Sequence, residues 1–465
     1  MSLEPDTGPK FVGPGSTLTI AEFITGVQDS DIPDKIVHQA KRTLINLMAV
    51  SLAAAFDEPS AILARRIEAE GSAPGATVIG RGLRTSPASA ALLNGYLAHL
   101  YDYDDTHFPT VLHPSAPVWP AVLALAEQRG LSGRETLTAF VLGAEVACRV
   151  ATSVHPWHYD QGWHITGTAG AFGAAAGAGK VLGLTAAQMV HALGVAGTQA
   201  SGVREAFGSH TKALHPAKAA SNGLQAALLA QDGFTGPEQI IEGRRGFWAV
   251  LSPGGHSKPA LLEGLGQRWE LERNGLKPYA NGVVSHPIQD AIISLRNIHG
   301  ITPDQVSSIT ARVHPLVLEL MNRPAPTTGL EAKFSFQHCA AAALVDGAGH
   351  PAQFTDERVN DPIIAMVRSK VSASADPSIE EDEVSVTLTL GGGRTVETRV
   401  EHATGSPSNP MTDAALEDKF SALASAILPR EQAEGLLNAV WTLDEAAGLS
   451  ALIGLMVRPE EAGRS

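Results

Sequence analysis

The sequence predicts a mainly α-helical protein, in which a large all-helical region is combined with a smaller α/β domain. Up to about residue 265, apolar residues recur every three or four positions, which is the spacing of helices. Aromatic residues make up only 5% of the 465-residue chain while alanine and glycine abound, a composition typical of closely packed helices. After residue 300 the pattern changes to the alternation that is typical of strands.

The helices of the large region follow from this spacing. In residues 33–56, for example, Ile36, Ala40 and Leu44 share one face. The predicted helices span residues 17–27, 33–56, 86–100, 116–128, 136–154, 166–183, 185–199 and 217–231. The Pro/Gly-rich residues 1–16 are predicted to form an irregular arm.

The segment 166–183, TGTAGAFGAAAGAGKVLG, is unusually rich in glycine for a helix. Glycine destabilises an isolated helix, so another interaction must compensate. We expect this helix to lie in a buried bundle, where the missing side chains allow neighbouring helices to approach closely.

The smaller domain is predicted from alternating segments. Residues 383–390 read EVSVTLTL, the three glycines at 391–393 turn the chain, and residues 394–400 return, which together indicate a β-hairpin. Residues 306–313 form another strand, and 287–298 an intervening helix. Two helices are expected after a Pro/Ser/Asn break, packed back on the first domain. The predicted division is therefore 1–268 for the all-α domain, 269–404 for the α/β domain and 405–465 for the returning helices.

Composition excludes several classes of function. The formal net charge of −14 argues against a nucleic-acid partner and against a polybasic membrane surface. The two cysteines, Cys148 and Cys339, exclude a disulfide framework and fit a reducing cytoplasm. The N-terminus does not read as a signal peptide, and no uninterrupted apolar segment of about eighteen residues predicts a transmembrane helix.

The stretch from Asn94 to Pro120 concentrates titratable residues between two apolar segments. Three aspartates (102, 104 and 105) and two histidines, His107 and His113, fall within twelve residues, together with Thr106. Charged groups are costly to bury unless they are paired or hydrogen-bonded, so the stretch indicates a polar site inside the fold. The alternative is a solvated helix end, with one aspartate as an N-cap.

Three further stretches carry candidate functional residues. His164 lies in QGWHITGT just before the glycine-rich helix, where the positive helix end favours a neutral imidazole that is able to act as a base. Lys212 lies in SHTKALHPA, in a predicted loop entering a helix, and His286 begins a helix in KPYANGVVSHPIQD. Each has an ordinary alternative: a locally bonded histidine, a solvated lysine and a plain helical turn.

Taken together, these stretches resemble the MmgE/PrpD family. The resemblance rests on GYLAHLYDYDDTH with LHPSAPV, GWHITGTAGAFGAAA, SHTKALHPAKAA, KPYANGVVSHPIQDA and KFSFQHCAAAALVDG, in the family's order across most of residues 15–455. It implies a large all-α domain with a smaller α/β lid domain, commonly a homodimer, and chemistry without a metal or cofactor on small di- or tricarboxylates.

The resemblance also implies roles for individual residues. Asp102 and Thr106 match a DxxxT pair and are expected to bind substrate or orient an imidazole. The expected catalytic residues are His113, His164, Lys212 and, from the lid, His286. His113 lies one residue further from the threonine than in the family pattern.

Several reactions share this acid/base chemistry. Proton removal and return on the opposite face gives an epimerase, elimination gives a dehydratase, and loss of carbon dioxide followed by protonation gives a decarboxylase. Because bases lie on several separate segments, the sequence favours an epimerase of the iminodisuccinate type, ahead of a 2-methylcitrate-type dehydratase and a cis-aconitate-type decarboxylase.

The competing class is a metal enzyme. The carboxylates and imidazoles of the acidic stretch, namely Asp102, Asp104, Asp105, His107 and His113, are suitable ligands for a divalent cation. Their spacing matches neither a Ca²⁺ loop nor an H-E-x-x-H motif, so no metal is predicted.

Overall fold

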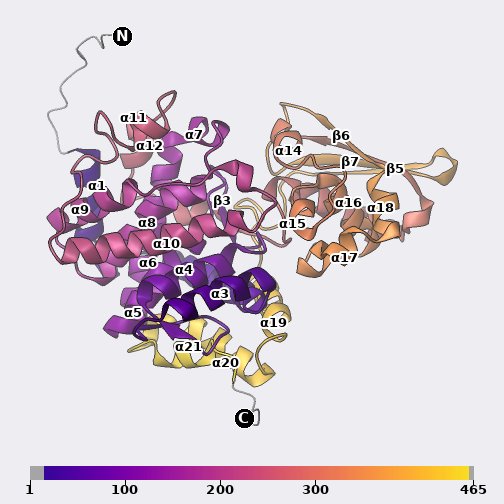
Figure 1. Ribbon diagram of the computed structural model, residues 1–465. Helices are drawn as coiled ribbons and strands as arrows, with labels where there is room; N and C mark the ends of the chain where they lie inside the picture. Colours follow the sequence, from indigo (N-terminus) through magenta and orange to yellow (C-terminus); the bar gives the residue numbers. More distant parts are fainter. Residues whose placement is uncertain (1–14, 460–465) are drawn as a thin grey trace.

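The computed structural model describes residues 15–459, which form two lobes that meet along one side (Figure 1). The predicted arm of residues 1–16 lies almost wholly outside the described residues. The prediction of a mainly α protein with a smaller mixed domain is confirmed: helices fill the larger lobe, and a four-stranded sheet with short helices forms the smaller lobe.

Long helices form the larger lobe, and all but one of them, at residues 58–70, lie close to a predicted segment. They are α1 (Ser16–Gly26), α2 (Asp34–Ala54), α3 (Glu58–Glu70), α4 (Pro87–His99), α5 (Ser115–Arg129), α6 (Gly133–Val154), α8 (Ile165–Val181), α9 (Ala186–Gly197) and α10 (Thr211–Gln231). The shorter α7 (Trp157–Asp160), α11 (Phe247–Leu251) and α12 (Lys258–Leu262) connect them. Helix α6 has the length and apolar composition of a membrane span, but 94% of that window is buried inside the protein.

The glycine-rich helix α8 lies in the middle of this bundle, as its composition predicts. A Cβ atom on Gly173 would lie 2.6 Å from the Cβ of Ala147 and 2.7 Å from the carbonyl oxygen of Gly143, both on α6. A Cβ atom on Gly170 would lie 2.8 Å from the Pro117 side chain on α5. The bare glycines therefore allow α8 to pack directly on α5 and α6, which fixes the position of its N-terminus.

Helix α10 begins earlier than predicted. The structure starts it at Thr211, so that Lys212 and His215 lie in its first turns, not in a loop. Pro216 is the reason for the error, because a proline inside a helix removes one backbone hydrogen bond and is more often found at a helix start. The early start fixes Lys212 on a rigid element.

The smaller lobe contains the sheet. Strand β5 (Val306–Val313) pairs in parallel with β6 (Val371–Ala375) and antiparallel with β7 (Val384–Leu390), which forms the predicted hairpin with β8 (Thr395–Val400). Helix α13 (His286–His299) packs on the hairpin and on α16 (Phe336–Val345). The remaining helices are α14 (Pro315–Leu320), α15 (Gly329–Ala332), α17 (Asp356–Val359) and α18 (Pro362–Arg368).

The chain returns to the larger lobe after the sheet, in three helices where two were expected. These are α19 (Asp413–Ala424), α20 (Arg430–Trp441) and the short α21 (Ser450–Leu455), drawn in yellow in Figure 1. Helix α19 packs on α2, and Leu416 and Phe420 belong to the same core as the first helices. The first core runs slightly past the predicted limit of residue 268, to Leu276, and the exact domain limits stay a prediction.

Two of the strands that were not predicted connect the parts of the site. Strand β3 (Asp105–His107) pairs antiparallel with β4 (Asn274–Leu276), with Asp105 opposite Leu276. A second pair, β1 (Ala76–Thr77) and β2 (Arg84–Thr85), lies elsewhere in the larger lobe. The β3–β4 pair brings the acidic stretch beside the segment that leads into the smaller lobe, although about 170 residues separate them in sequence.

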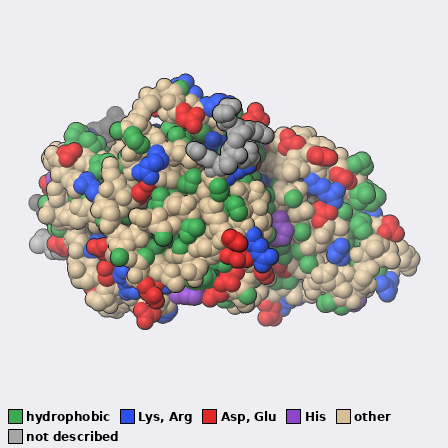
Figure 2. Space-filling view, turned by 90° about the horizontal axis from the view of Figure 1, so that it is seen from below, with side chains coloured by type: hydrophobic (Ala, Val, Ile, Leu, Met, Phe, Trp, Pro, Cys, Tyr) green, Lys and Arg blue, Asp and Glu red, His purple; other side chains and the backbone are tan. Residues whose placement is uncertain are grey.

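The outer surface offers few clues to function. On the face in Figure 2, acidic and basic side chains are scattered over both lobes among apolar and neutral groups. The concentration of polar groups that the sequence predicts lies inside the protein, where Asp102, Asp104, His113, His164 and Lys212 are all buried.

Candidate active site

Three helix N-termini meet at the buried polar groups. Helix α5 starts directly after His113 and Pro114, α8 starts directly after His164, and Lys212 is the second residue of α10. The first turn of a helix has unpaired N–H groups and a partial positive charge. The backbone around this site therefore favours an anion.

Asp102 lies between two lysines. Its Oδ1 atom is 2.7 Å from Nζ of Lys277 and 3.2 Å from Nζ of Lys212, and Lys277 also donates to the Asp102 carbonyl. Burial alone would raise the pKa of Asp102, but the two ammonium groups hold it well below its usual range. Asp102 has a φ of 51°, a left-handed conformation that is uncommon outside glycine and that turns its carboxylate towards the lysines.

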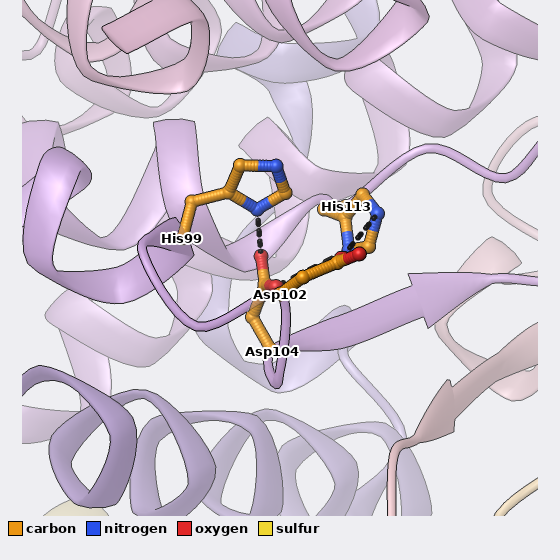
Figure 3. A group of neighbouring side chains, drawn as sticks. All are labelled: His99, Asp102, Asp104 and His113. Atoms are coloured by element: carbon orange, nitrogen blue, oxygen red, sulfur yellow. Dashed lines mark hydrogen bonds and ion pairs between the residues drawn. The ribbon is translucent and has the colours of Figure 1, made fainter. Parts of the chain in front are cut away.

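His99 and Asp104 form a second buried pair, which the sequence analysis missed. Nδ1 of His99 is 2.8 Å from Oδ2 of Asp104, and Nε2 of His99 is 2.9 Å from Nζ of Lys212. Figure 3 shows the imidazoles of His99 and His113 turned towards the loop that carries Asp102 and Asp104. Burial lowers the pKa of His99 to about 4, while His99 and His113 hold the pKa of Asp104 well below its usual range despite its burial.

His113 is held in one tautomer by its surroundings. Its Nδ1 atom is 2.8 Å from the Asp105 carbonyl oxygen and 3.4 Å from Oδ1 of Asp104, and both are acceptors, so Nδ1 carries a hydrogen. In the neutral ring, Nε2 then has a free lone pair, and it lies 3.8 Å from Oδ1 of Asp102. His113 is therefore suited to accept a proton. The Thr106 hydroxyl lies beside the same ring, 3.5 Å from Nδ1.

His164 pairs with a second imidazole. Its Nδ1 atom lies 2.9 Å from Nδ1 of His215, so one ring donates to the other. Burial, followed by the positive charge of Lys212, holds the pKa of His164 well below its usual value. The ring is therefore neutral at neutral pH.

These groups line one small cavity with two different walls. Its volume is about 40 Å³. The larger lobe and the β3–β4 region contribute the polar wall, made by Asp102, Thr106, His113, Tyr159, His164, Lys212 and Lys277. The smaller lobe contributes Gly282, Val283, Val284, Leu320, Met321 and Phe334, none of which titrates. The ionisable groups that line the cavity therefore all come from the larger lobe or from Lys277.

Two family models match the chain in tandem: the MmgE/PrpD N-terminal domain over residues 18–260 and the MmgE/PrpD C-terminal domain over residues 279–445. The chain belongs to the MmgE/PrpD family. The resemblance stated from the motifs is thereby confirmed, and the protein is an enzyme of this family.

Among its relatives, the MmgE/PrpD enzyme is similar to cis-aconitate decarboxylases over nearly the whole length. The protein from Mus musculus is 30% identical over 461 residues, covering 95% of this chain and 93% of the relative. The protein from Homo sapiens is also 30% identical, covering 95% of both chains. A cis-aconitate decarboxylase from Aspergillus terreus is 27% identical over 480 residues, covering 96% of both.

Five of the six residues predicted for the MmgE/PrpD site line the cavity, and His286 does not. The His286 ring packs edge-on against Tyr279, and its Nε2 atom lies 3.3 Å from the Asn281 carbonyl oxygen. Burial and the nearby Lys277 ammonium lower its pKa to about 3. Its catalytic role stays a prediction.

The sequence analysis missed His99, Asp104 as its partner, and Lys277. His99 is the last residue of the apolar helix α4, and nothing in its immediate neighbours distinguishes it from a core histidine. Lys277 stands in the KPY motif from which only the histidine was selected. Lys277 precedes a proline and follows a strand that the sequence does not predict, so its approach to Asp102 depends on the β3–β4 pair.

The acidic stretch does not act as one cluster, which bears on the competing metal interpretation. Asp105 accepts hydrogen bonds from Ser115 and Asn274, and His107 bonds to Glu270, so both point away from the cavity. His99, Asp102, Asp104 and His113 do offer ligand atoms within 4.8 Å of one another.

We expect purified MmgE/PrpD enzyme to contain far less than stoichiometric divalent metal, and EDTA to leave its turnover unchanged. The reason is that Nζ of Lys212 already lies 2.9 Å from Nε2 of His99 and 3.2 Å from Oδ1 of Asp102, and a divalent cation there would be repelled by this ammonium. Elemental analysis and assays before and after chelation measure both quantities. Activity that EDTA abolishes and Mg²⁺ or Zn²⁺ restores would contradict this expectation.

Proposed function

We propose that this enzyme decarboxylates a small unsaturated di- or tricarboxylate of the cis-aconitate type, without a cofactor. The observation that carries the proposal is the origin of the ionisable groups that line the cavity: each comes from the larger lobe or is Lys277, which follows β4. The 30% identity to cis-aconitate decarboxylases over 95% of the chain supports the same reaction.

The charges on this wall suit a carbanion. When the carbon–carbon bond to the departing carboxylate breaks, its electron pair stays on the substrate and spreads onto a neighbouring carboxylate. Lys212 and the N-termini of α8 and α10 present fixed positive charge where this negative charge develops. One proton then adds to the substrate carbon, and carbon dioxide leaves.

The residues divide between charge stabilisation and proton transfer. Lys212 supplies an ammonium group at the cavity and is our candidate for stabilising the carbanion. His164 and His113 are the candidates for delivering the proton and recovering it from water, because both are buried imidazoles on the same wall. Thr106 is the candidate for binding a carboxylate oxygen, and Asp102 for holding the two lysines.

The epimerase that the sequence favours is the second candidate. Its supporting observation is unchanged: His113, His164 and Lys212 come from three separate elements. Opposite-face epimerisation, however, needs a proton donor and a base on two sides of one carbon. The wall contributed by the smaller lobe is apolar, and His286, the base expected from the lid, does not line the cavity. Protonation on one face is therefore the better supported chemistry.

The cavity also implies movement before catalysis. A volume of about 40 Å³ is far less than the roughly 300 Å³ or more of ordinary small-molecule sites. A wider cleft of about 680 Å³ lies nearby between the lobes, lined among others by Tyr101, His210 and Lys333. Substrate entry thus requires the two walls to separate.

We expect proton NMR of the enzyme in D₂O with cis-aconitate to reveal itaconate that carries deuterium at one carbon. Parallel tubes contain 2-methylcitrate and the iminodisuccinate stereoisomers. An inverted, α-deuterated iminodisuccinate with no loss of carbon dioxide would instead identify an epimerase, and a new alkene from 2-methylcitrate a dehydratase. Either result without turnover of cis-aconitate would overturn the proposed decarboxylation.

A further inference from the structure

The hydrogen-bond donors of Lys212 are almost fully assigned. An ammonium group has three N–H donors. One faces Nε2 of His99 at 2.9 Å and a second faces Oδ1 of Asp102 at 3.2 Å. Among residues 15–459, no other hydrogen-bond acceptor is in reach of Nζ, which lies over the faces of Phe207 and Phe334, 5.3 and 5.6 Å from the ring centres. One N–H is therefore left for a molecule in the cavity.

The tautomer of His99 follows from its two partners. The Asp104 carboxylate is ionised and accepts only, so Nδ1 of His99 must carry the hydrogen in their 2.8 Å bond. The ring is neutral because burial lowers its pKa to about 4. Nε2 is then an acceptor, and Lys212 is the donor in the next bond. Each group in the series fixes the role of its neighbour.

We propose that Asp104, His99 and Lys212 form a carboxylate–imidazole–ammonium relay, in which Asp104 fixes the His99 tautomer and His99 orients the Lys212 ammonium towards the cavity. His99 and Asp104 are positioning residues, and neither lines the cavity. The inference rests on the proposed function in one respect: Lys212 is taken to face the charge that develops on the substrate.

The relay matters because a lysine is otherwise poorly oriented. Its four-carbon stem rotates freely and its ammonium is a point charge without a preferred direction. Two fixed acceptors on one side leave a single direction for the third N–H, so little reorganisation is needed when charge develops. The other charged or titratable groups near this ammonium are Asp102, Lys277, Lys333, His113, His164 and His215.

The Asp104→Asn variant tests the relay because its amide orientation is predictable. Oδ1 of Asp104 faces Nδ1 of His113 at 3.4 Å, and that nitrogen carries a hydrogen. That N–H is donated to the Asp105 carbonyl oxygen, and Oδ1 of Asp104 has no hydrogen-bond partner of its own. An amide NH₂ group at the Oδ1 position would face this N–H, so the amide oxygen is expected there and the amide N–H turns to Nδ1 of His99. His99 then adopts the Nε2–H tautomer, and its N–H faces the Lys212 ammonium.

The first measurement needs no substrate. Long-range ¹H–¹⁵N spectra of ¹⁵N-histidine-labelled wild-type enzyme, assigned with His99→Gln, are expected to show His99 protonated at Nδ1. The Asp104→Asn spectrum is expected to show it protonated at Nε2. The matched control is Asp382→Asn, which alters an exposed carboxylate–imidazole pair with His402 and should leave the His99 signals unchanged. Wild-type His99 protonated at Nε2 would overturn the relay, whatever the substrate proves to be.

The second measurement concerns Lys212 itself. With [¹³Cε]lysine labelling, assigned by Lys212→Met, the ammonium in Asp104→Asn is expected to lose its proton at a lower pH than in wild type, by about one unit, or about tenfold in neutral amine. With the active substrate, kcat should fall by about 10²-fold and KM far less, because the loss is one of transition-state orientation. An unchanged lysine titration in a correctly folded variant would overturn the proposal.

A pair of His99 variants separates positioning from packing. The amide oxygen of His99→Gln can replace Nε2 as an acceptor, whereas His99→Leu fills the space without one. The relay predicts that kcat of the glutamine variant exceeds that of the leucine variant by about tenfold, the value of one charge-assisted hydrogen bond. Equal kcat values in two folded variants would show that His99 serves only to fill space.

Discussion

Replacing Lys212 by Met is expected to reduce kcat by about 10³-fold or more, the largest effect on activity among the substitutions considered. Methionine keeps the length of the stem and its contacts with Phe207 and Phe334 but removes the ammonium that lies over those two rings at the cavity. Loss of a preorganised charge costs about 10²–10³ in kcat, and an accompanying loss of acid/base assistance adds to it. Steady-state kinetics on the substrate found by NMR measures the effect.

The same helix supplies the control for this substitution. Lys218 is exposed on α10, one and a half turns further along, and Lys218→Met removes an equal charge from the protein surface. It should leave kcat within about twofold, since exposed charges interact weakly. Full turnover by a folded Lys212→Met enzyme would refute the role assigned to the ammonium.

The pH dependence of kcat provides a second test of the Lys212 ammonium. Burial lowers the pKa of Lys212 below that of a free lysine, although Asp102 opposes the shift. A lysine is charged below its pKa, so the active form is lost as pH rises through this lowered value. The alkaline limb of kcat against pH is thus expected below the ordinary lysine pKa of about 10.4.

Replacing Lys419 by Met is expected to lower the free energy of unfolding by about 3 kcal/mol or more. Lys419, on α19, is 7% exposed and bonds to the Asn46 side chain and to the carbonyl oxygens of Tyr103 and Lys277, at 2.6, 2.9 and 2.8 Å. Methionine would leave these three buried acceptors without a donor. Urea unfolding followed by circular dichroism measures the change.

The exposed neighbour Asp418 provides the comparison for Lys419. Asp418→Ala alters the same helix without touching a buried group, and it should change stability by less than about 0.5 kcal/mol. The Lys419 substitution should also reduce activity, because Tyr103 lies between the two site aspartates and Lys277 contacts one of them. A Lys419→Met protein as stable as wild type would mean that water replaces the lost donor.

Helical spacing and turn residues were enough to predict most of the fold from the sequence. The hairpin of β7 and β8 was predicted because seven alternating residues and three glycines leave little choice. Strands β3 and β4 were not, since three residues are too few to display an alternation. The start of α10 was misplaced because Pro216 lies inside the helix, where proline is unfavourable.

Candidate site residues that stand close together in the sequence could be predicted. Residues that meet only after the chain has folded could not. Asp102, Thr106 and His113 were found because they stand in one polar stretch, and Lys212 and His164 because their motifs resemble the family's. His99 and Lys277 were missed because each gains its importance only from a partner far along the chain, at distances of 2.9 and 2.7 Å. The spacing of residues within one segment cannot reveal a partner that lies far along the chain.

The two chain segments that connect the lobes lie side by side at Leu276 and Gly405. Leu276 donates its backbone N–H to the carbonyl oxygen of Gly405, so the segments that lead into and out of this lobe are hydrogen-bonded to each other. The part of the smaller lobe between Lys277 and Gly405 is thus an insert with adjacent ends, and its side chains that line the cavity are all uncharged. This insert could be exchanged as a unit. Grafting the corresponding segment of a relative onto the same junction would change the shape of the cavity while its ionisable side chains stay in place. Diversification of substrates within one catalytic framework then needs no new acid or base, only a different insert.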